Sequence, residues 1–516
     1  MESYLRYLQT LGKSPSYPMS VRGFSLHELD LMAPRDSAHP WAQRYSLNAT
    51  PTQQHRWDYV RPTAEFTFNS AFPYGSNDGA VWKGKGITSS VVAGVSARWS
   101  GLSVVLAPTL FRAENAAFPL MKHQNTSEGE FADGPFPQII DLPQRFGDTP
   151  YQRIDWGEST IRLDAHGMAL GVSTASEWWG PTNDFPFVLG NNAGGFPHVL
   201  FGTSEPVNVG VGKMHGRVIY GLIDQSAFSP VTGPTYVTDS LNLGTRRFAA
   251  GLVAVLQVRG VPGLEIGGAR FFHAGYKRGG ITAQRFSLPF QQLLKGRVNA
   301  VVDSSLGSPD AGENQLASLF FRWSPPGSGS DIYGEFGRDD HSQDIRDFLF
   351  EPEHASGLNI GFRHAWMSGT NITAVRAEAF EYGEARSEGD RFEGFIYTHA
   401  FLRQGHTSRG QLLAADVGPG SGSAQIIALD RFSTVGRSTL YFRRVVQHEK
   451  NGELIGIEPG TVKKPVDVLN SLGWEMSRFV GKVDITVKAA LTFDLNRYFL
   501  SDQTNATVGI AARQSF

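Results

Sequence analysis

A strict alternation of apolar and other side chains constrains the fold of this sequence more than any other feature. In the clearest stretch, residues 483–495, apolar side chains occupy every second position, and Asp484, Lys488 and Asp494 are among the residues between them. Successive side chains of a β-strand point to opposite faces, whereas the apolar face of a helix recurs every three or four residues. The stretch therefore predicts a strand, and one much longer than the five or six residues usual in globular proteins.

The same period of two recurs at residues 87–99, 248–258 and 358–366, and the opposite faces carry Gly, Ser, Thr, Arg and Asp. Long strands of this kind, without helices between them, are typical of transmembrane barrels with a water-filled lumen. A soluble sandwich or propeller also alternates, but its strands are shorter. We therefore predict an all-β fold, a large antiparallel transmembrane β-barrel. At about 25 residues for each strand and its connection, the chain after the first 56 residues supplies about eighteen strands.

The final residues favour a barrel of the bacterial outer-membrane type. Ala506, Val508, Ile510 and Ala512 share one face of a strand, and the chain ends on Phe516. A terminal strand of this form resembles the C-terminal assembly signal of bacterial outer-membrane barrels. We therefore place the chain in the bacterial outer membrane.

The first residues have helical periodicity instead. Tyr4, Leu5 and Leu8 fall on one helical face, and Gly12 ends this pattern. Ser25-Leu-His-Glu has the spacing of a capping box that opens a second helix, and a third short helix is expected around residues 39–45. We therefore predict two regions, a helical segment over residues 1–56 and the barrel over residues 57–516.

Composition excludes several classes of site and partner. The 516 residues contain no Cys, which removes disulfides, Cys-based zinc sites, iron–sulfur clusters and cysteine nucleophiles. A net charge of −2 provides no basic field for nucleic acid. The stretch 185–204 is free of Asp, Glu, Lys and Arg, but its Pro and Gly residues prevent a membrane helix. The start of the chain lacks the apolar region of a secretory signal, and because export requires one, we expect a chain truncated at its start.

No catalytic motif stands out. The P-loop, His-Glu-x-x-His and Gly-x-Ser-x-Gly patterns are absent. Carboxylate pairs such as Asp339 and Asp340 would suit a glycosidase only at a set separation, and a chain of this length supplies such pairs by count. We predict no catalytic residue, no metal and no cofactor.

Two segments combine aromatic, amide and cationic side chains, and we take both as candidate polysaccharide-binding clusters. The first contains Trp178, Trp179, Asn191, Asn192 and His198, and the second contains Arg403, His406 and Arg409. A sugar presents C–H faces and a rim of hydroxyls, so aromatic faces beside hydrogen-bonding groups suit carbohydrate. The alternative is that both segments pack inside the barrel and form hydrogen bonds in its lumen.

The order of several short motifs carries a resemblance over nearly the whole chain. They are Arg22-Gly-Phe-Ser-Leu-His-Glu, Asn69-Ser-Ala-Phe-Pro-Tyr-Gly-Ser-Asn-Asp-Gly, Trp178-Trp-Gly-Pro, Phe196-Pro-His and Gln404-Gly-His-Thr-Ser-Arg-Gly. In these motifs the chain resembles the Wzi-type capsule assembly proteins, a bacterial outer-membrane family. The resemblance implies an eighteen-stranded barrel with a small helical plug on the periplasmic side. It also implies a lectin-like role without catalysis, in which the barrel holds capsular polysaccharide or exopolysaccharide at the cell surface.

We therefore expect a monomeric barrel whose partners are polysaccharide and outer-membrane lipid. A porin-like diffusion channel is the main alternative, because Arg363, Arg376 and Asp494 lie on the polar faces of predicted strands. An outer-membrane enzyme acting on polysaccharide is a third hypothesis. Conductance across a planar bilayer would identify the channel, and turnover of labelled glycan would identify the enzyme.

Overall fold

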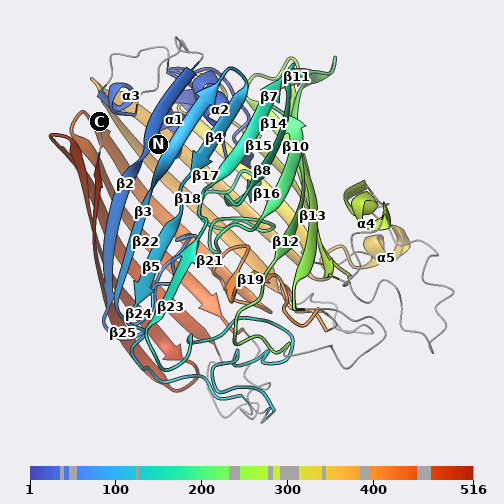
Figure 1. Ribbon diagram of the computed structural model, residues 1–516, viewed down its shortest axis with the longest axis vertical. Helices are drawn as coiled ribbons and strands as arrows, with labels where there is room; N and C mark the ends of the chain where they lie inside the picture. The colour runs from blue at the N-terminus through green and yellow to red at the C-terminus, as the bar shows by residue number, and fades with distance from the viewer. Residues whose placement is uncertain are drawn as a thin grey trace.

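The computed structural model describes residues 1–34, 40–45, 55–123, 125, 127–231, 245–276, 283–290, 313–339, 345–383, 395–400, 402–449 and 466–514. Most of its strands form one closed barrel, with the N-terminal helices inside one end (Figure 1), and β1 with β9 and β19 with β20 form two separate two-stranded sheets. In chain order the elements are α1 (Glu2–Thr10), β1 (Val21–Arg22), α2 (Leu26–Leu31), α3 (Pro40–Arg44), β2 (His55–Asn69), β3 (Gly86–Trp99), β4 (Leu102–Leu106), β5 (Thr109–Ala113), β6 (Tyr151–Asp155), β7 (Thr160–Ala165), β8 (Met168–Ser173), β9 (Trp178–Trp179), β10 (His198–Thr203), β11 (Val207–Asn208), β12 (Gly212–Ile223), β13 (Arg247–Val258), β14 (Leu264–Gly275), α4 (Ala283–Ser287), η1 (Leu288–Phe290), β15 (Glu313–Trp323), β16 (Ser330–Asp339), α5 (Ile345–Phe350), β17 (Ser356–Ser368), β18 (Asn371–Gly383), β19 (Thr407–Ser408), β20 (Gln411–Leu412), β21 (Gly422–Ser433), β22 (Gly436–Gln447), β23 (Asp467–Val480), β24 (Val483–Arg497) and β25 (Ser501–Gln514).

The barrel confirms the predicted fold class. Each barrel strand pairs antiparallel with the next barrel strand in the sequence, and β2 closes the ring against β25, with Phe66 opposite Ile510. Three of these barrel strands are interrupted, and each is made of two shorter strands that run in succession along one neighbour. The pairs are β4 with β5, β6 with β7, and β10 with β11. The described residues therefore contain eighteen barrel strands. The four stretches with a period of two become β3, β13, β17 and β24, and Phe516 lies outside the described residues.

The two ends of the barrel differ in their connections. At one end, here called the termini end, short turns join β3 to β4 and β23 to β24. At the opposite end, here called the loop end, residues 114–150, 174–197 and 395–421 lie between consecutive barrel strands. Outer-membrane barrels have short periplasmic turns and long extracellular loops. The connection lengths thus agree with a loop end that faces the outside of the cell.

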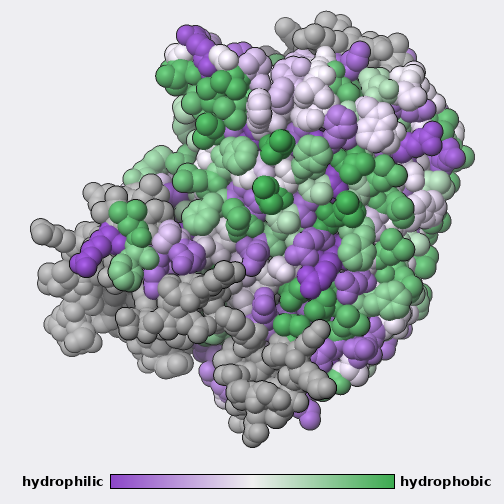
Figure 2. All heavy atoms as spheres, turned by 180° about the vertical axis from the view of Figure 1, so that it is seen from behind, coloured by the Kyte–Doolittle hydropathy of each residue, from purple (hydrophilic) through white to green (hydrophobic). Residues whose placement is uncertain are grey.

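The outer wall of the barrel is largely apolar. Exposed apolar side chains on alternate strand positions include Ile87, Val91, Leu319, Ile360, Ile427, Leu472 and Val508, and Figure 2 shows hydrophobic residues spread over one face of this wall. In β13 the outward-facing Phe248 and Ala250 are buried, because Leu288 of η1 packs on them from outside. Among the described residues, no helix is long and apolar enough to span a membrane.

The N-terminal segment, residues 1–34 and 40–45, packs inside the termini end. The predicted capping box is confirmed, because the Ser25 hydroxyl accepts from the Glu28 N–H and the Ser25 N–H donates to the Glu28 carboxylate. In α1, the Tyr7 hydroxyl donates to Asp430 of the wall at 2.7 Å, and the Gly327 N–H donates to the Thr10 carbonyl at 3.0 Å. The predicted third helix is α3, although residue 39 lies outside the described residues.

The lumen differs from the water-filled interior that the alternation predicts. Arg363, Arg376 and Asp494 are buried and ion-paired there, as their polar faces indicate. Yet Phe271 and Leu316 also belong to inner strand faces, where they lie fully buried in an apolar cluster. The physical reason is that loop-end connections fold inward and bring apolar side chains of their own, so part of the lumen is packed as a core.

Candidate functional site

Two loop-end connections fold into the lumen and meet there. They are residues 174–197 and 395–421, here called the inward loops, and they carry most of the sequence-predicted candidates. The Gly190 N–H donates to the Leu413 carbonyl at 2.8 Å, and the Ala415 N–H donates to the Pro186 carbonyl at 3.0 Å. Backbone hydrogen bonds therefore join the two loops that carry most residues of the predicted clusters.

The tandem tryptophans face opposite environments. β9 pairs with β1 of the N-terminal segment, which places Trp178 under the Arg22 guanidinium at 4.1 Å. Trp179 is fully buried and meets Phe271 edge-on at a centroid distance of 6.2 Å. A Cβ atom on Gly251 would lie 2.4 Å from the Trp179 ring, so this glycine makes room for the indole in the wall. Both tryptophans therefore pack within the described barrel, which is the alternative left open by the sequence.

His198 is part of a buried polar cluster centred on Glu177. The Glu177 carboxylate accepts from the Trp179 indole at 3.1 Å and from Arg217 at 2.8 Å, and it lies 3.6 Å from Nε2 of His198. Burial alone would raise the pKa of Glu177, but Arg217 and His198 hold it below its usual range. The cluster ties an inward loop to β12 and to the start of β10.

The two asparagines connect the inward loops to a third connection, residues 70–85. Asn191 donates to the Asn77 carbonyl at 3.3 Å, and its own carbonyl accepts from the Gly79 N–H at 2.8 Å. Asn192 donates to the Leu412 carbonyl at 3.2 Å and also lines a cleft described below. Of this pair, only Asn192 is among the residues that line this cleft.

The second predicted cluster is dispersed. His406 is fully buried and stacks on Tyr397 with ring centroids 5.5 Å apart, and its Nε2 atom lies 2.7 Å from the Val188 carbonyl oxygen. Burial lowers the pKa of His406 to about 3, so its imidazole is neutral near pH 7. Arg403 donates to the Gln138 carbonyl and pairs with Glu128 at 3.1 Å, apart from the other two. Arg409 reaches Asp155 and Asp224 and lines a separate pocket.

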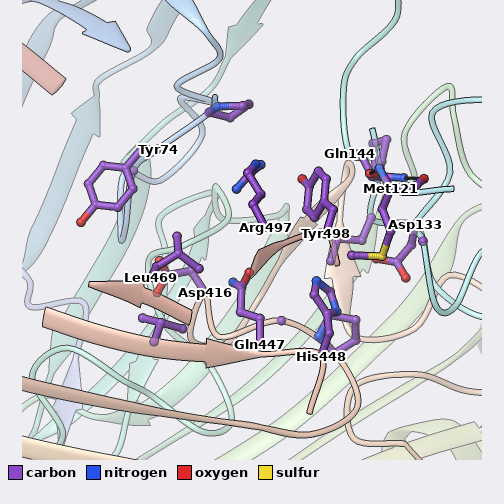
Figure 3. A pocket seen from close by; sticks show the side chains of 18 of the residues that line it. Tyr74, Met121, Asp133, Gln144, Asp416, Gln447, His448, Leu469, Arg497 and Tyr498 are labelled. Carbon is purple, nitrogen blue, oxygen red and sulfur yellow. Dashed lines mark hydrogen bonds between the residues drawn. The ribbon is translucent and has the colours of Figure 1, made fainter. Parts of the chain in front are cut away.

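A cleft at the loop end is the strongest candidate site, and we call it the central cleft. It consists of two adjoining cavities of about 250 and 230 Å³ that share Tyr74, Trp82 and Asp416. Figure 3 shows Tyr74 on one side and Met121, Asp133 and Gln144 on the other, with Arg497 and Tyr498 between them. Further lining residues are Asn192, Gln411, Arg443, Gln447, His448 and Leu469.

Burial sets the protonation of the titratable groups in the central cleft. It raises the pKa of Asp133 to about 7, against a single hydrogen bond from the Phe136 N–H. It also raises the pKa of Asp416, although Arg443 pairs with this carboxylate at 2.6 Å and Ser76 donates to it. Burial lowers the pKa of His448 to about 4, with Arg497 acting in the same direction. Near neutral pH, His448 is thus uncharged, and Asp133 carries a proton part of the time.

The cleft combines the groups that carbohydrate recognition requires. Tyr74, Trp82 and Tyr498 supply aromatic surface, and Gln447 supplies an amide that can both donate and accept hydrogen bonds. The Gln144 amide bonds the backbone of Met121 and Ala132 and so holds the wall of the cleft in place. In the described part of the chain, no group of three or more His, Cys, Asp or Glu residues is placed to hold a metal ion.

Sequence reasoning missed most of these residues. Tyr74 lies within the quoted 69–79 motif, where an aromatic between Pro73 and Gly75 in a loop is a usable signal. Gln447 is the last residue of β22 and Tyr498 directly follows β24, with no local signal at either position, and only the closure of the barrel brings them to the cleft with Tyr74.

Comparisons with known proteins agree with this architecture. The family model of the capsule assembly protein Wzi matches residues 74–505, whereas no curated protein matches significantly. Among solved structures, Wzi of Escherichia coli, an outer membrane protein involved in group 1 capsule assembly and a carbohydrate-binding β-barrel, has 14% sequence identity and a TM-score of 0.64. The alignment covers 99% of this chain and 97% of that one.

More distant likenesses involve other outer-membrane barrels. OprD of Pseudomonas aeruginosa has 6% identity and a TM-score of 0.41 over 90% of this chain and 94% of its own. A BenF-like porin of Pseudomonas fluorescens has 9% identity and a TM-score of 0.39 over 89% and 99%. At such scores neither bears on function. The family match extends over most of the chain and the E. coli barrel shares its fold, so this outer-membrane barrel belongs to the Wzi capsule assembly family.

Proposed function

We propose that the protein binds capsular polysaccharide or exopolysaccharide at its loop end and anchors it to the outer surface of the cell. The observation that carries this proposal is the central cleft, where the aromatic side chains of Tyr74, Trp82 and Tyr498 stand beside the amide of Gln447. Family membership supports it, because the related E. coli barrel is a carbohydrate-binding protein of capsule assembly. Each of the two cavities of the central cleft is small, so firm retention of a polymer would come from many weak contacts acting together.

The proposal is one of binding without turnover. A glycosidase needs two carboxyl groups held across a scissile bond, with one as acid and the other as base or nucleophile. In the central cleft, Asp133 and Asp416 are instead used internally, by the Phe136 N–H and by Arg443 with Ser76. We also propose a monomeric barrel surrounded by outer-membrane lipid, because its exposed apolar side chains form a belt on the outer wall.

The N-terminal segment, predicted as a plug within residues 1–56, is proposed to close the periplasmic side. Arg6 of α1 donates to Asp331 of the wall at 3.0 Å, and the Trp41 indole donates to the Ser433 carbonyl at 2.6 Å. Together with the inward loops, these contacts oppose a porin-like channel, because they place packed side chains across the lumen.

A retention assay with purified protein tests the proposal. The cell's own polysaccharide should be retained by the wild type, and Tyr74→Ala should weaken retention by up to about tenfold through loss of aromatic stacking. Trp156→Ala is the matched control, because this tryptophan is exposed on the outer wall, away from the cleft. The proposal fails if the wild type retains no polysaccharide and deletion of the gene leaves the capsule attached.

A further inference from the structure

A second pocket at the loop end contains an alternating series of arginines and aspartates. This side pocket has a volume of about 520 Å³, and Arg409 reaches into it from the tip of the β19–β20 hairpin. In order, the series runs Arg153, Asp155, Arg409, Asp224, Arg246, with the four successive pairs in ion-pair contact. Each aspartate therefore lies between two arginines, and an arginine stands at each end.

The series has an unequal number of charges. The series contains three guanidinium groups and two carboxylates, so its described residues together carry one net positive charge. Exposure increases toward one end, since the side chain of Asp155 is 2% exposed and that of Arg246 is 53% exposed. Arg246 contacts Asp224 through its Nε atom and is the most exposed member of the series, so it is the arginine that a ligand carboxylate meets at the mouth of the pocket.

The backbone at Arg409 is strained in a way that favours a role for its side chain. Arg409 and Gly410 form the two-residue turn of the hairpin with φ of +50° and +82°. Such a turn favours Asn or Gly at its first position, and another residue there costs on the order of 1 kcal/mol. The Arg409 N–H donates to the Asp224 carbonyl at 2.9 Å, so the same aspartate fixes both the backbone and the side chain.

The opposite wall of the side pocket is aromatic. Phe146 and Tyr151 stack with ring centroids 4.2 Å apart and an interplanar angle of 11°, and Phe228 meets Phe146 edge-on. Phe146 also contacts Trp82 of the central cleft at 5.0 Å. One aromatic cluster thus borders both the side pocket and the central cleft.

We propose that the side pocket binds a carboxylate-bearing sugar unit, such as a uronic acid, of the polysaccharide that the central cleft holds. The carboxylate pairs with Arg246 and completes the charge series, and the C–H face of the ring packs on Tyr151 and Phe228. Carboxylates bind guanidinium groups through two parallel hydrogen bonds, which a neutral sugar cannot supply. The inference rests on the proposed function and adds the chemical class of the ligand.

Two forms of one polymer test this proposal on the full-length protein in detergent. The probes are the polysaccharide shed by the producing cells and the same material after its carboxyl groups are reduced to primary alcohols. Carboxyl reduction should weaken binding by at least about tenfold, the value of one charge-assisted contact. Arg246→Gln should weaken binding of the native polymer about as much and leave binding of the reduced polymer unchanged, and Arg246→Lys should fall between.

The control is Lys122→Gln, which removes one cation from an exposed position on the loop-end connection 114–150 and outside both pockets. It should bind both forms as the wild type does. Equal binding of native and reduced polymer, or unchanged binding by Arg246→Gln, overturns the acidic-sugar proposal while polysaccharide binding stands. Retention of a polymer that contains no carboxylate does the same. Failure to retain either form refutes both proposals.

Discussion

The contact between α1 and the barrel wall allows a sharp test of how the N-terminal segment is held. Asp331 of β16 is fully buried and receives the Arg6 guanidinium at 3.0 Å and that of Arg322 at 3.1 Å. Arg363 lies 3.7 Å from the same carboxylate. One buried anion therefore compensates three buried cations, with help from Glu265, which pairs with Arg322 at 2.6 Å.

The two sides of this contact should respond very differently to substitution. Asp331→Asn leaves three buried guanidinium groups without their shared carboxylate, and breaking a buried pair from one side costs about 3–5 kcal/mol. Arg6→Met keeps an unbranched side chain of similar length and leaves Asp331 paired with Arg322. Only the Nε atom of Arg6 makes a hydrogen bond, and its two terminal nitrogens have none. Loss of that one bond should cost at most about 2 kcal/mol.

Equilibrium unfolding in urea, with the barrel in lipid vesicles and tryptophan fluorescence as the signal, measures both variants. With an m-value of about 3 kcal/mol per M, a loss of 4 kcal/mol moves the unfolding midpoint by a little over 1 M. Asp331→Asn should show such a shift and Arg6→Met about half of it or less. Equal shifts for the two variants would refute the reasoning, as would an Asp331→Asn midpoint at the wild-type value.

Three further predictions concern the cleft, the lumen and conduction. Because the pKa of Asp133 is raised from 3.8 to about 7, the folded state binds more protons than the unfolded one between these values, and wild-type stability should fall as pH rises from 4 to 7. Asp133→Asn should remove this pH dependence, and above pH 7 its free energy of unfolding in urea should exceed that of the wild type by up to about 4 kcal/mol. Parallel pH profiles of stability for the wild type and the variant would contradict this prediction. A Cβ atom on Gly337 would lie 2.0 Å from the Phe187 ring, so Gly337→Ala should lower the free energy of unfolding by about 1–3 kcal/mol in the same assay. Gly383→Ala should be tolerated, because a Cβ atom there would lie 3.7 Å from the nearest atom, the Cβ of Ser421. In planar bilayers the wild type should give no steady openings of porin size, and such openings would contradict a packed lumen.

The strands and the capping box could be predicted because their signals are local. A period of two is readable within any dozen residues, and the residues on the inner and outer faces follow from it directly. The same holds for Ser25 and Glu28, which are three positions apart and meet within one turn of helix. Family resemblance added the expectation of an N-terminal plug, because no local pattern shows that this segment packs against the wall.

The site could not be predicted as well, because it depends on contacts between distant parts of the chain. Trp179 and His406 have the composition of a sugar site, yet both are buried against Phe271 of the wall. Aromatic residues serve a packed core and a sugar platform equally well, so composition alone cannot separate the two uses. What separates them is whether a loop folds inward or stays at the mouth.

The inward fold of these loops also explains how a barrel can offer a firm binding surface on long connections. Glu378 of the wall accepts from the backbone N–H groups of Asn183 at 2.7 Å and Phe185 at 2.8 Å, which fixes one inward loop. That loop in turn holds the other through the hydrogen bond from Ala415 to Pro186, one residue before Asp416 of the central cleft. A cleft floor anchored in this way is ordered before any ligand arrives, so binding does not carry the entropic cost of ordering a loop. Weak contacts with single sugar units can then contribute to retention of a polymer, and the packing that closes the lumen is the same packing that makes the cleft rigid.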